Sequence, residues 1–384
     1  MSSAPLLLEL GCEEIPARMI ATAATDLAAR VVAILDRAKL PHGPVQAWGG
    51  TRRLSVHVAE VAARVADERK LLLGPPAAAA FGADGTPTPA AIGFARKQGI
   101  DPATLGRVET DKGSYAGVER VVLGRSLGEL LAEGLPAAVA AMSFPKTMRW
   151  GTGAHRWVRP LHWLAALHGG EPLPLELFGV RAGRVSNGHR FLAPGPVDVA
   201  HADGYAAALR AAYVVIDPAE RRRLLEERLA QAAARVGGAL VPDAELLDEV
   251  ADLVEWPGVV VGRFDPDFLD LPREILVTTL RHHQKSFCVQ TSSGLSNSFL
   301  AVANTDRDPA GHVQRGNEWV VSGRLADARF FWDEDRKRPL ADRLEELAKV
   351  AFHARLGSYR EKAQRIERRA AELAERLSAA DRDA

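Results

Sequence analysis

Apolar residues recur along this chain with two different periods, which predict a mixture of strands and helices. Within residues 52–61, apolar side chains alternate through Leu54, Val56 and Val58, which is typical of a strand with one buried face. Residues 5–12 form a short apolar run, and Pro16 follows at a position where the first turn of a helix tolerates proline. This part of the chain therefore predicts a strand, a helix and a second strand.

The clearest helix signal begins at Asp217 and ends at Gly237. Asp217 is placed as the N-cap, Pro218 as the first helical residue and Glu220 as the capping-box partner. An apolar stripe at helical spacing follows, and it consists of Leu225, Leu229, Ala232 and Val236. A second helix is expected from Asp243.

The remaining pattern alternates between short strands and helices until about residue 318, where it becomes helical and highly charged. The fold class predicted is α/β (α+β), with mixed-sheet domains followed by a helical C-terminal segment and a break at Pro339. The predicted domains are 1–135, 136–312 and 313–384. The further elements are strands at 115–122, 258–264, 286–290 and 299–303, helices at 90–99 and 271–283, and a connector or exposed loop at 74–89.

Composition narrows the class of protein without identifying it. The chain has 384 residues, enough for two or three domains, and it carries 49 basic and 49 acidic residues. Two cysteines are too few for a disulfide framework or a cysteine-based zinc site. No apolar run is long enough for a membrane span, and no signal peptide is visible. We expect a cytoplasmic protein that does not contact a membrane.

The charges are unevenly distributed, and this points to a polyanion. No Asp or Glu occurs between Glu133 and Glu171, whereas that stretch holds one Lys, three Arg and three Trp. Arg and Lys neutralise phosphates, and Trp and His stack on bases, so the mixture suits RNA. We expect most of the tryptophans, including Trp157 and Trp163, to be structural. The RNA-binding candidates are Arg52, Arg53, Lys146, Arg149, Arg156, Arg159, His189, Arg190, Arg281, His282, His283 and Lys285.

Most catalytic signatures are absent. The sequence has no phosphate-binding loop ending in Gly-Lys-Ser/Thr, no G-x-G-x-x-G and no G-x-S-x-G. Residues 283–287 fit half of an ATP-binding loop of class II tRNA ligases, but the other half is missing upstream, so we reject an adenylation site. His162 and His168 have a zinc-finger-like gap without a cysteine pair. We assign neither catalytic residues nor metal ligands.

Eight blocks of residues, in order from residue 6 to about residue 360, resemble the beta subunit of bacterial glycine–tRNA ligase. They read L-L-L-E-L-G-C-E-E-I-P, W-G-G-T-R-R-L, T-D-K-G, F-P-K-T-M-R-W-G, W-V-R-P-L-H-W, S-N-G-H-R-F, L-V-E-W-P and G-N-E-W-V-V-S-G-R-L-A-D-A-R-F-F-W-D-E-D-R-K. Cys12 departs from the family pattern, in which Thr is usual.

The resemblance implies a fold and a role. Residues 136–312 would be similar to the editing-type domain of the phenylalanine–tRNA ligase beta subunit, followed by the start of a helical domain. Family members are roughly twice this length, so the chain looks like an amino-terminal portion without the anticodon-binding domain. The separate alpha subunit would bind ATP, Mg²⁺ and glycine in an alpha-two beta-two assembly. This chain would bind tRNA(Gly) and hold no cofactor itself.

Two other interpretations stay open. The chain could be an assembly scaffold whose basic residues contact no tRNA, or it could keep a residual hydrolase activity on mischarged tRNA. The second has little physical motivation, because glycine is the smallest amino acid and a tight pocket excludes larger ones without an editing step.

Overall fold

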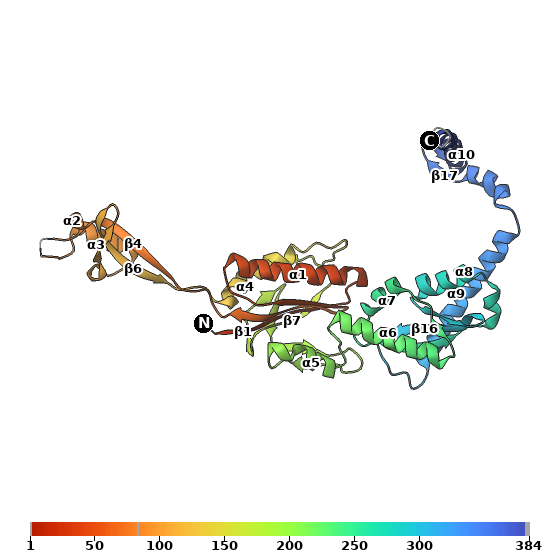
Figure 1. The fold of residues 1–384 in the computed structure, drawn as a ribbon, viewed down its shortest axis with the longest axis horizontal. Helices are drawn as coiled ribbons and strands as arrows, with labels where there is room; N and C mark the ends of the chain where they lie inside the picture. The colour runs from red at the N-terminus through yellow and green to blue at the C-terminus, as the bar shows by residue number, and fades with distance from the viewer. Residues whose placement is uncertain (1, 83, 381–384) are drawn as a thin grey trace. The chain divides into compact units, whose positions relative to one another are not determined.

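A computed structural model describes residues 2–82 and 84–380 (Figure 1). The chain forms two compact units, Met1–Leu224 with Leu247–Pro257, and Leu225–Leu246 with Gly258–Ala384. This division differs from the predicted domains. The strand Leu161–His168 pairs directly with the strand Ser3–Cys12, so one sheet joins residues on both sides of the predicted boundary at 135. The mixed α/β class with a helical C-terminal segment is confirmed.

The first unit is built on a seven-stranded sheet whose main strand order is β2-β3-β1-β7-β10-β9. β1 lies between β3 and β7 and runs antiparallel to both, while β10 runs parallel to β7. The predicted strand at 52–61 is β3. The strands are β1 (Ser3–Cys12), β2 (Val45–Gly50), β3 (Arg53–Ala62), β7 (Leu161–His168), β8 (Glu171–Pro172), β9 (Glu176–Leu177) and β10 (Val180–Gly183).

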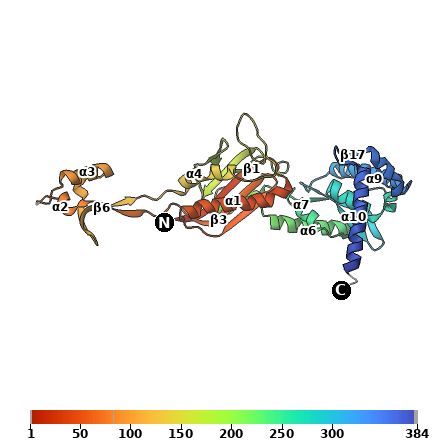
Figure 2. The same cartoon turned by 90° about the horizontal axis from the view of Figure 1, so that it is seen from above.

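Both faces of β1 are buried, because helices cover the sheet on both sides (Figure 1, Figure 2). Leu6, Leu8 and Leu10 belong to the core beneath α1 (Ala17–Arg37) and α4 (Leu127–Ala140). Leu7, one position out of phase, belongs to a second core beside α5 (Tyr205–Ala211). Since side chains alternate along a strand, Glu9 points to the α5 side, where it is buried.

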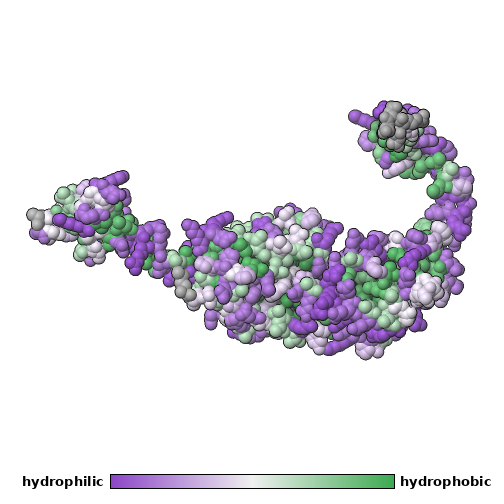
Figure 3. All heavy atoms as spheres, viewed as in Figure 1, coloured by the Kyte–Doolittle hydropathy of each residue, from purple (hydrophilic) through white to green (hydrophobic). Residues whose placement is uncertain are grey.

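A small module with its own core occupies residues 68–122 of the first unit. Its sheet has the order β4-β6-β5, and the alanines of α2 and α3 pack on one face with Ala116. The predicted connector at 74–89 is partly wrong, since it contains the end of β4 and all of α2; residue 83 lies outside the described residues. Figure 3 shows hydrophobic residues at the surface of this module. The elements are β4 (Glu68–Pro76), α2 (Ala77–Ala80), α3 (Pro89–Gln98), a 3₁₀ turn (Pro102–Thr104), β5 (Gly106–Thr110) and β6 (Gly113–Val122).

The predicted helix after Asp217 is α6 (Pro218–Arg235), and its N-cap is confirmed. The Asp217 carboxylate accepts the backbone N–H of Ala219 at 2.8 Å. One half of the predicted capping box forms, since the Glu220 N–H donates to the Asp217 carboxylate at 3.3 Å. The Glu220 carboxylate accepts a hydrogen bond from Arg210. Nearby elements are β11 (Val185–Asn187), β12 (Pro196–Asp198), a 3₁₀ turn (Ala202–Gly204), β13 (Ala239–Leu240) and α7 (Ala244–Ala251).

The second unit contains a four-stranded sheet of order β13-β15-β16-β14 and a series of helices. The predicted helix at 271–283 is α8 followed by one π-helical turn, Thr279–His283. None of the helices in the described part of the chain is long and apolar enough to cross a bilayer. The elements are β14 (Gly258–Arg263), a 3₁₀ helix (Pro266–Asp270), α8 (Arg273–Thr278), β15 (Phe287–Thr291), β16 (Gly294–Ala303), α9 (His312–Arg336), a 3₁₀ helix (Leu340–Lys349), β17 (Ala351–His353), β18 (Gly357–Ser358) and α10 (Tyr359–Ala380).

Candidate functional site

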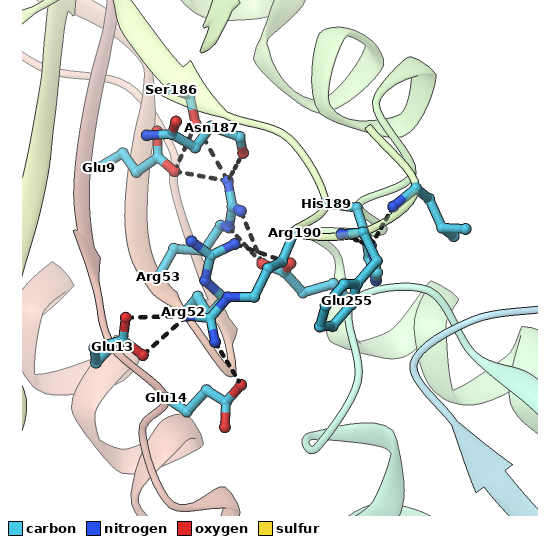
Figure 4. A network of polar contacts seen from close by, with 12 residues as sticks. Glu9, Glu13, Glu14, Arg52, Arg53, Ser186, Asn187, His189, Arg190 and Glu255 are labelled. Carbon is cyan, nitrogen blue, oxygen red and sulfur yellow. Dashed lines mark hydrogen bonds and ion pairs between the residues drawn. The ribbon is translucent and has the colours of Figure 1, made fainter. Parts of the chain in front are cut away.

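Arg53 is the centre of a buried ion-pair network at the end of β1 and β3 (Figure 4). Its Nη1 donates to Glu9 Oε1 at 3.0 Å, and its Nη2 donates to Glu255 Oε1 at 2.8 Å. Nη1 also reaches Ser186 Oγ at 3.2 Å and the carbonyl oxygen of Asn187 at 2.9 Å. Burial lowers the pKa of Arg53, but the two carboxylates outweigh it and raise that pKa above its ordinary value.

The network corrects the prediction for Arg53. This side chain is 0% exposed, and a buried charge persists only when it is paired. Arg53 is therefore not available for a direct RNA contact; it joins β1, β3, β11 and the segment that ends at Pro257.

Arg52 and His189 are also held inside the fold. The Arg52 side chain is 12% exposed, lies 3.9 Å from Glu255 and stacks over the Trp163 ring at 5.4 Å. Burial lowers the pKa of Arg52. His189 is fully buried, and its Nδ1 accepts the backbone N–H groups of Phe191 and Leu192 at 3.2 and 3.1 Å. His189 thus shapes a loop, contrary to its prediction as an RNA contact.

Arg190 and Arg159 both bind the Glu13-Glu14 segment. Nη2 of Arg190 donates to the two carboxylate oxygens of Glu13 at 3.0 and 2.9 Å, and Nη1 lies 3.6 Å from Glu14. This hydrogen bond lowers the pKa of Glu13 and raises the pKa of Arg190. Nε of Arg159 donates to the carbonyl oxygen of Glu14 at 2.8 Å. These two cations are therefore neutralised or engaged within the chain.

A loop that we call the cationic hairpin, residues 146–157, holds the other three cations of the stretch. Lys146, Arg149 and Arg156 are exposed, and none of them has an ion pair with a described residue. Met148 and Trp157 close the hairpin through two backbone hydrogen bonds of 2.8 and 3.2 Å. The hairpin is thus the part of the predicted set in which positive charge faces solvent unpaired.

The aromatic residues of the same stretch are structural, as predicted. Trp157 is 1% exposed and packs edge-on against Phe144, with ring centroids 5.7 Å apart. Trp163 is buried in β7, beneath Arg52. The sequence interleaves cations with aromatics, whereas the structure sends the cations outward and anchors the loop by its aromatics.

The remaining candidates lie in the second unit. Nε of Arg281 is 2.7 Å from Asp243, and Nη2 is 2.6 Å from Glu245, so this cation is paired. His282 and His283 are exposed on the π-helical turn, and Lys285 is half-buried after it. Paired Arg281 does not add to an open positive surface.

Two kinds of side chain could support metal or covalent chemistry among the described residues: clustered metal ligands and reactive thiols. No group of three His, Cys, Asp or Glu among them could hold a metal ion. Both cysteines are buried: burial raises the pKa of Cys12 far above its usual range and that of Cys288 to about 11. The accessible features are electrostatic, and they suit binding.

Sequence reasoning missed the residues that neutralise the buried arginines. Glu9 interrupts an otherwise apolar run in a strand, and a carboxylate in such a run must be paired, which is a signal that could have been used. It also missed Arg221, a buried side chain that donates to the carbonyl oxygens of Ala251 at 2.6 Å and Gly49 at 3.0 Å. Its partners are distant in sequence.

Comparison with known proteins gives one consistent result. The family model described as Glycyl-tRNA synthetase beta subunit matches residues 6–384. The glycine–tRNA ligase beta subunit of Syntrophus aciditrophicus is 42% identical over 374 residues, covering 97% of this chain and 54% of that protein. The corresponding proteins of Syntrophotalea carbinolica and Anaeromyxobacter dehalogenans are each 43% identical, with the same coverage.

The chain thus spans about half the length of the curated relatives that it matches. The match nevertheless covers nearly all of this chain, and it confirms the resemblance seen in the eight sequence blocks. The chain belongs to the glycyl-tRNA synthetase beta subunit family.

Proposed function

We propose that this chain is the tRNA-binding part of a beta subunit that supports the attachment of glycine to tRNA(Gly). The observation that carries the proposal is the cationic hairpin, where Lys146, Arg149 and Arg156 are exposed without carboxylate partners. Like charges repel, so a cluster of unpaired cations fits a surface that binds phosphates. Arg52, Arg53, Arg190 and Arg281 are paired or buried, so they add no open positive charge.

We further propose a division of labour between two subunits. Activation of glycine with ATP and Mg²⁺ belongs to a separate alpha subunit in a cytoplasmic alpha-two beta-two assembly, and this chain holds neither cofactor. We also propose that residues 136–312 include an editing-type fold similar to that of the phenylalanine–tRNA ligase beta subunit. Pairing of β7 with β1 means that such a fold would include amino-terminal strands.

Charge reversal in the hairpin tests the tRNA contact. The variant Lys146→Glu/Arg149→Glu/Arg156→Glu should bind tRNA(Gly) at least tenfold more weakly than the unmodified chain in a filter-binding titration at about 100 mM salt. The matched control is Lys70→Glu/Arg96→Glu/Lys97→Glu, which changes the net charge equally at exposed positions of the small module. If the two variants lose equal affinity, bulk charge explains binding and the hairpin does not.

The scaffold interpretation is favoured by the pairing of most candidate arginines with carboxylates. It predicts that hairpin charge reversal leaves tRNA binding unchanged and weakens association with the alpha subunit. The ATP–pyrophosphate exchange reaction tests the division of labour: it should require the alpha subunit, and exchange by this chain alone would contradict the proposal.

A further inference from the structure

The loop after β11 buries a polar side chain and exposes an apolar one, which is the reverse of the usual arrangement. It buries its histidine, His189, and leaves its phenylalanine, Phe191, 74% exposed. A lone exposed apolar residue is ordinary on a flexible surface loop. This loop is not of that kind, because several hydrogen bonds determine its shape.

Hydrogen bonds hold the loop from inside and from both ends. His189 Nδ1 accepts the backbone N–H of Phe191 itself, at 3.2 Å, and that of Leu192. The N–H of His189 donates to the carbonyl oxygen of Ala212 at 3.0 Å, and the N–H of Gly188 donates to that of Gly195 at 3.0 Å. A Cβ on Gly188 would lie 2.4 Å from the carbonyl oxygen of Ala193, so the turn needs glycine. The fold therefore holds the backbone that carries Phe191 in a defined position, with the ring exposed.

The groups beside this loop are polar and balanced in charge. Arg190 precedes the ring and pairs with Glu13 and Glu14, while His162 lies 3.3 Å from Glu13. The anchor of a protein–protein interface lies in a patch depleted of charge, which these residues do not provide. A phosphate would find no unpaired cation here, because Arg190 is already paired with the two carboxylates. A nucleobase fits, since its face stacks on an aromatic ring and its edge carries donors and acceptors.

We propose that Phe191 is a stacking platform for an unpaired base of the bound RNA. The inference rests on the proposed function for its ligand, but it assigns a contact that the cationic hairpin does not make. The base must be unpaired, because both faces of a base within a duplex are already covered. Stacking on an aromatic side chain changes affinity by about 5- to 150-fold on alanine substitution.

The test compares Phe191→Ala, Phe191→Trp and Phe191→Leu in the full chain, titrated with tRNA(Gly) over a range of salt concentrations. Phe191→Ala should weaken binding at least fivefold, Phe191→Trp should bind as well as the unmodified chain, and Phe191→Leu should resemble Phe191→Ala. The slope of log K against log salt should stay unchanged in all three, because the contact carries no charge. Val185→Ala, which shortens another exposed apolar side chain nearby in sequence, is the control and should bind normally.

Three results would overturn the proposal: normal tRNA binding by Phe191→Ala, normal tRNA binding by Phe191→Leu, or a changed salt slope in any variant. Loss of alpha-subunit association with unchanged tRNA binding would assign Phe191 to a protein contact instead, and this also overturns it. Failure of the proposed function is a separate outcome. In that case the unmodified chain itself would not bind tRNA in the same titration.

Discussion

Arg53 Nη2 lies 2.8 Å from Glu255 Oε1, although 202 residues separate them in the sequence. Both side chains are buried, and Glu9 binds the other end of the same guanidinium. The pair connects the amino-terminal sheet to the segment Leu247–Pro257, which returns to the first unit from the second. One of the arginines that the sequence marks as a candidate RNA contact is thus a structural link.

Removing the guanidinium should destabilise the first unit strongly. Arg53→Met leaves the carboxylates of Glu9 and Glu255 buried without their cation, which should cost about 3–5 kcal/mol in the free energy of unfolding. Urea unfolding measures this cost. Arg181→Met is the control, since Arg181 is 88% exposed in its ion pair and should change stability by less than about 0.5 kcal/mol. Equal effects of both variants would contradict a structural role for the network.

The Arg190–Glu13 pair should make stability depend on pH in the acid range. The hydrogen bond from Arg190 lowers the pKa of Glu13 below that of an unfolded carboxyl, about 4.3. Its stabilising contribution is therefore present above that value and is lost as pH falls through the folded-state pKa. Glu13 is partly exposed, so the contribution is about 1 kcal/mol or less. The unfolding free energies of the unmodified chain and Arg190→Gln should differ at pH 7 and converge as pH falls below the folded-state pKa of Glu13; a constant difference would contradict this assignment.

The cationic hairpin should set part of the salt dependence of tRNA binding. Each phosphate contact adds about 0.7–0.9 to the slope of log K against log salt. Neutralising Arg149 and Arg156 to Gln should lower the slope by about 1–2. Binding titrations between about 50 and 200 mM salt give this value. Neutralising Arg96 and Lys97 in the same way should leave the slope as it is, and a matching drop there would remove the special role of the hairpin.

Two glycines should respond to alanine substitution with opposite signs. A Cβ on Gly11 would lie 1.8 Å from Trp163 Cε2, so Gly11→Ala must displace a buried indole and should destabilise the first unit by more than 1 kcal/mol. Gly316, inside α9, has open space around its Cβ position. Gly316→Ala should stabilise the helix by about 0.5–1 kcal/mol. Denaturant unfolding followed by circular dichroism checks both, and a loss of stability in Gly316→Ala would indicate that α9 is less open there than described.

The two thiols should be protected in the folded chain. Burial raises the pKa of Cys288 to about 11, so about one thousandth of this group is thiolate at pH 8, and Cys12 is shielded further. Labelling with an aromatic disulfide reagent at pH 8 should therefore be slow without denaturant and should reach two thiols per chain in urea. Rapid native labelling would show that one of the two sites opens.

Local patterns predicted local structure well. Alternation at 52–61 predicted β3, and Asp217 was correctly placed as the cap of α6. The strand β4 was missed because its last residues lie in a proline- and glycine-rich stretch that favours a loop. Within residues 146–157, the sequence predicted that the tryptophans are structural. It did not predict which of the cations are exposed and unpaired.

The candidate site was harder to predict because ion pairs between distant residues leave no local pattern. The sequence around Arg53 and Arg190 does not distinguish them from the exposed arginines of the cationic hairpin. The carboxylates that pair with Arg53 and Arg190 lie far away along the chain. Only the fold separates a neutralised arginine from an open one. Phe191 was missed for the converse reason, since a phenylalanine after His189 and Arg190 reads as an ordinary buried residue.

Because Leu247–Pro257 returns to the first unit, the ribosome synthesises the end of that unit after it has begun the second unit. Translation at about 5–20 residues per second puts about 10–40 s between the synthesis of Arg53 and that of Glu255. During that interval the nascent sheet lacks one of the two carboxylates that neutralise its central arginine, while residues of the second unit are already being made. The ion-pair network of Arg53 is thus completed by one of the last residues of its own unit to be synthesised.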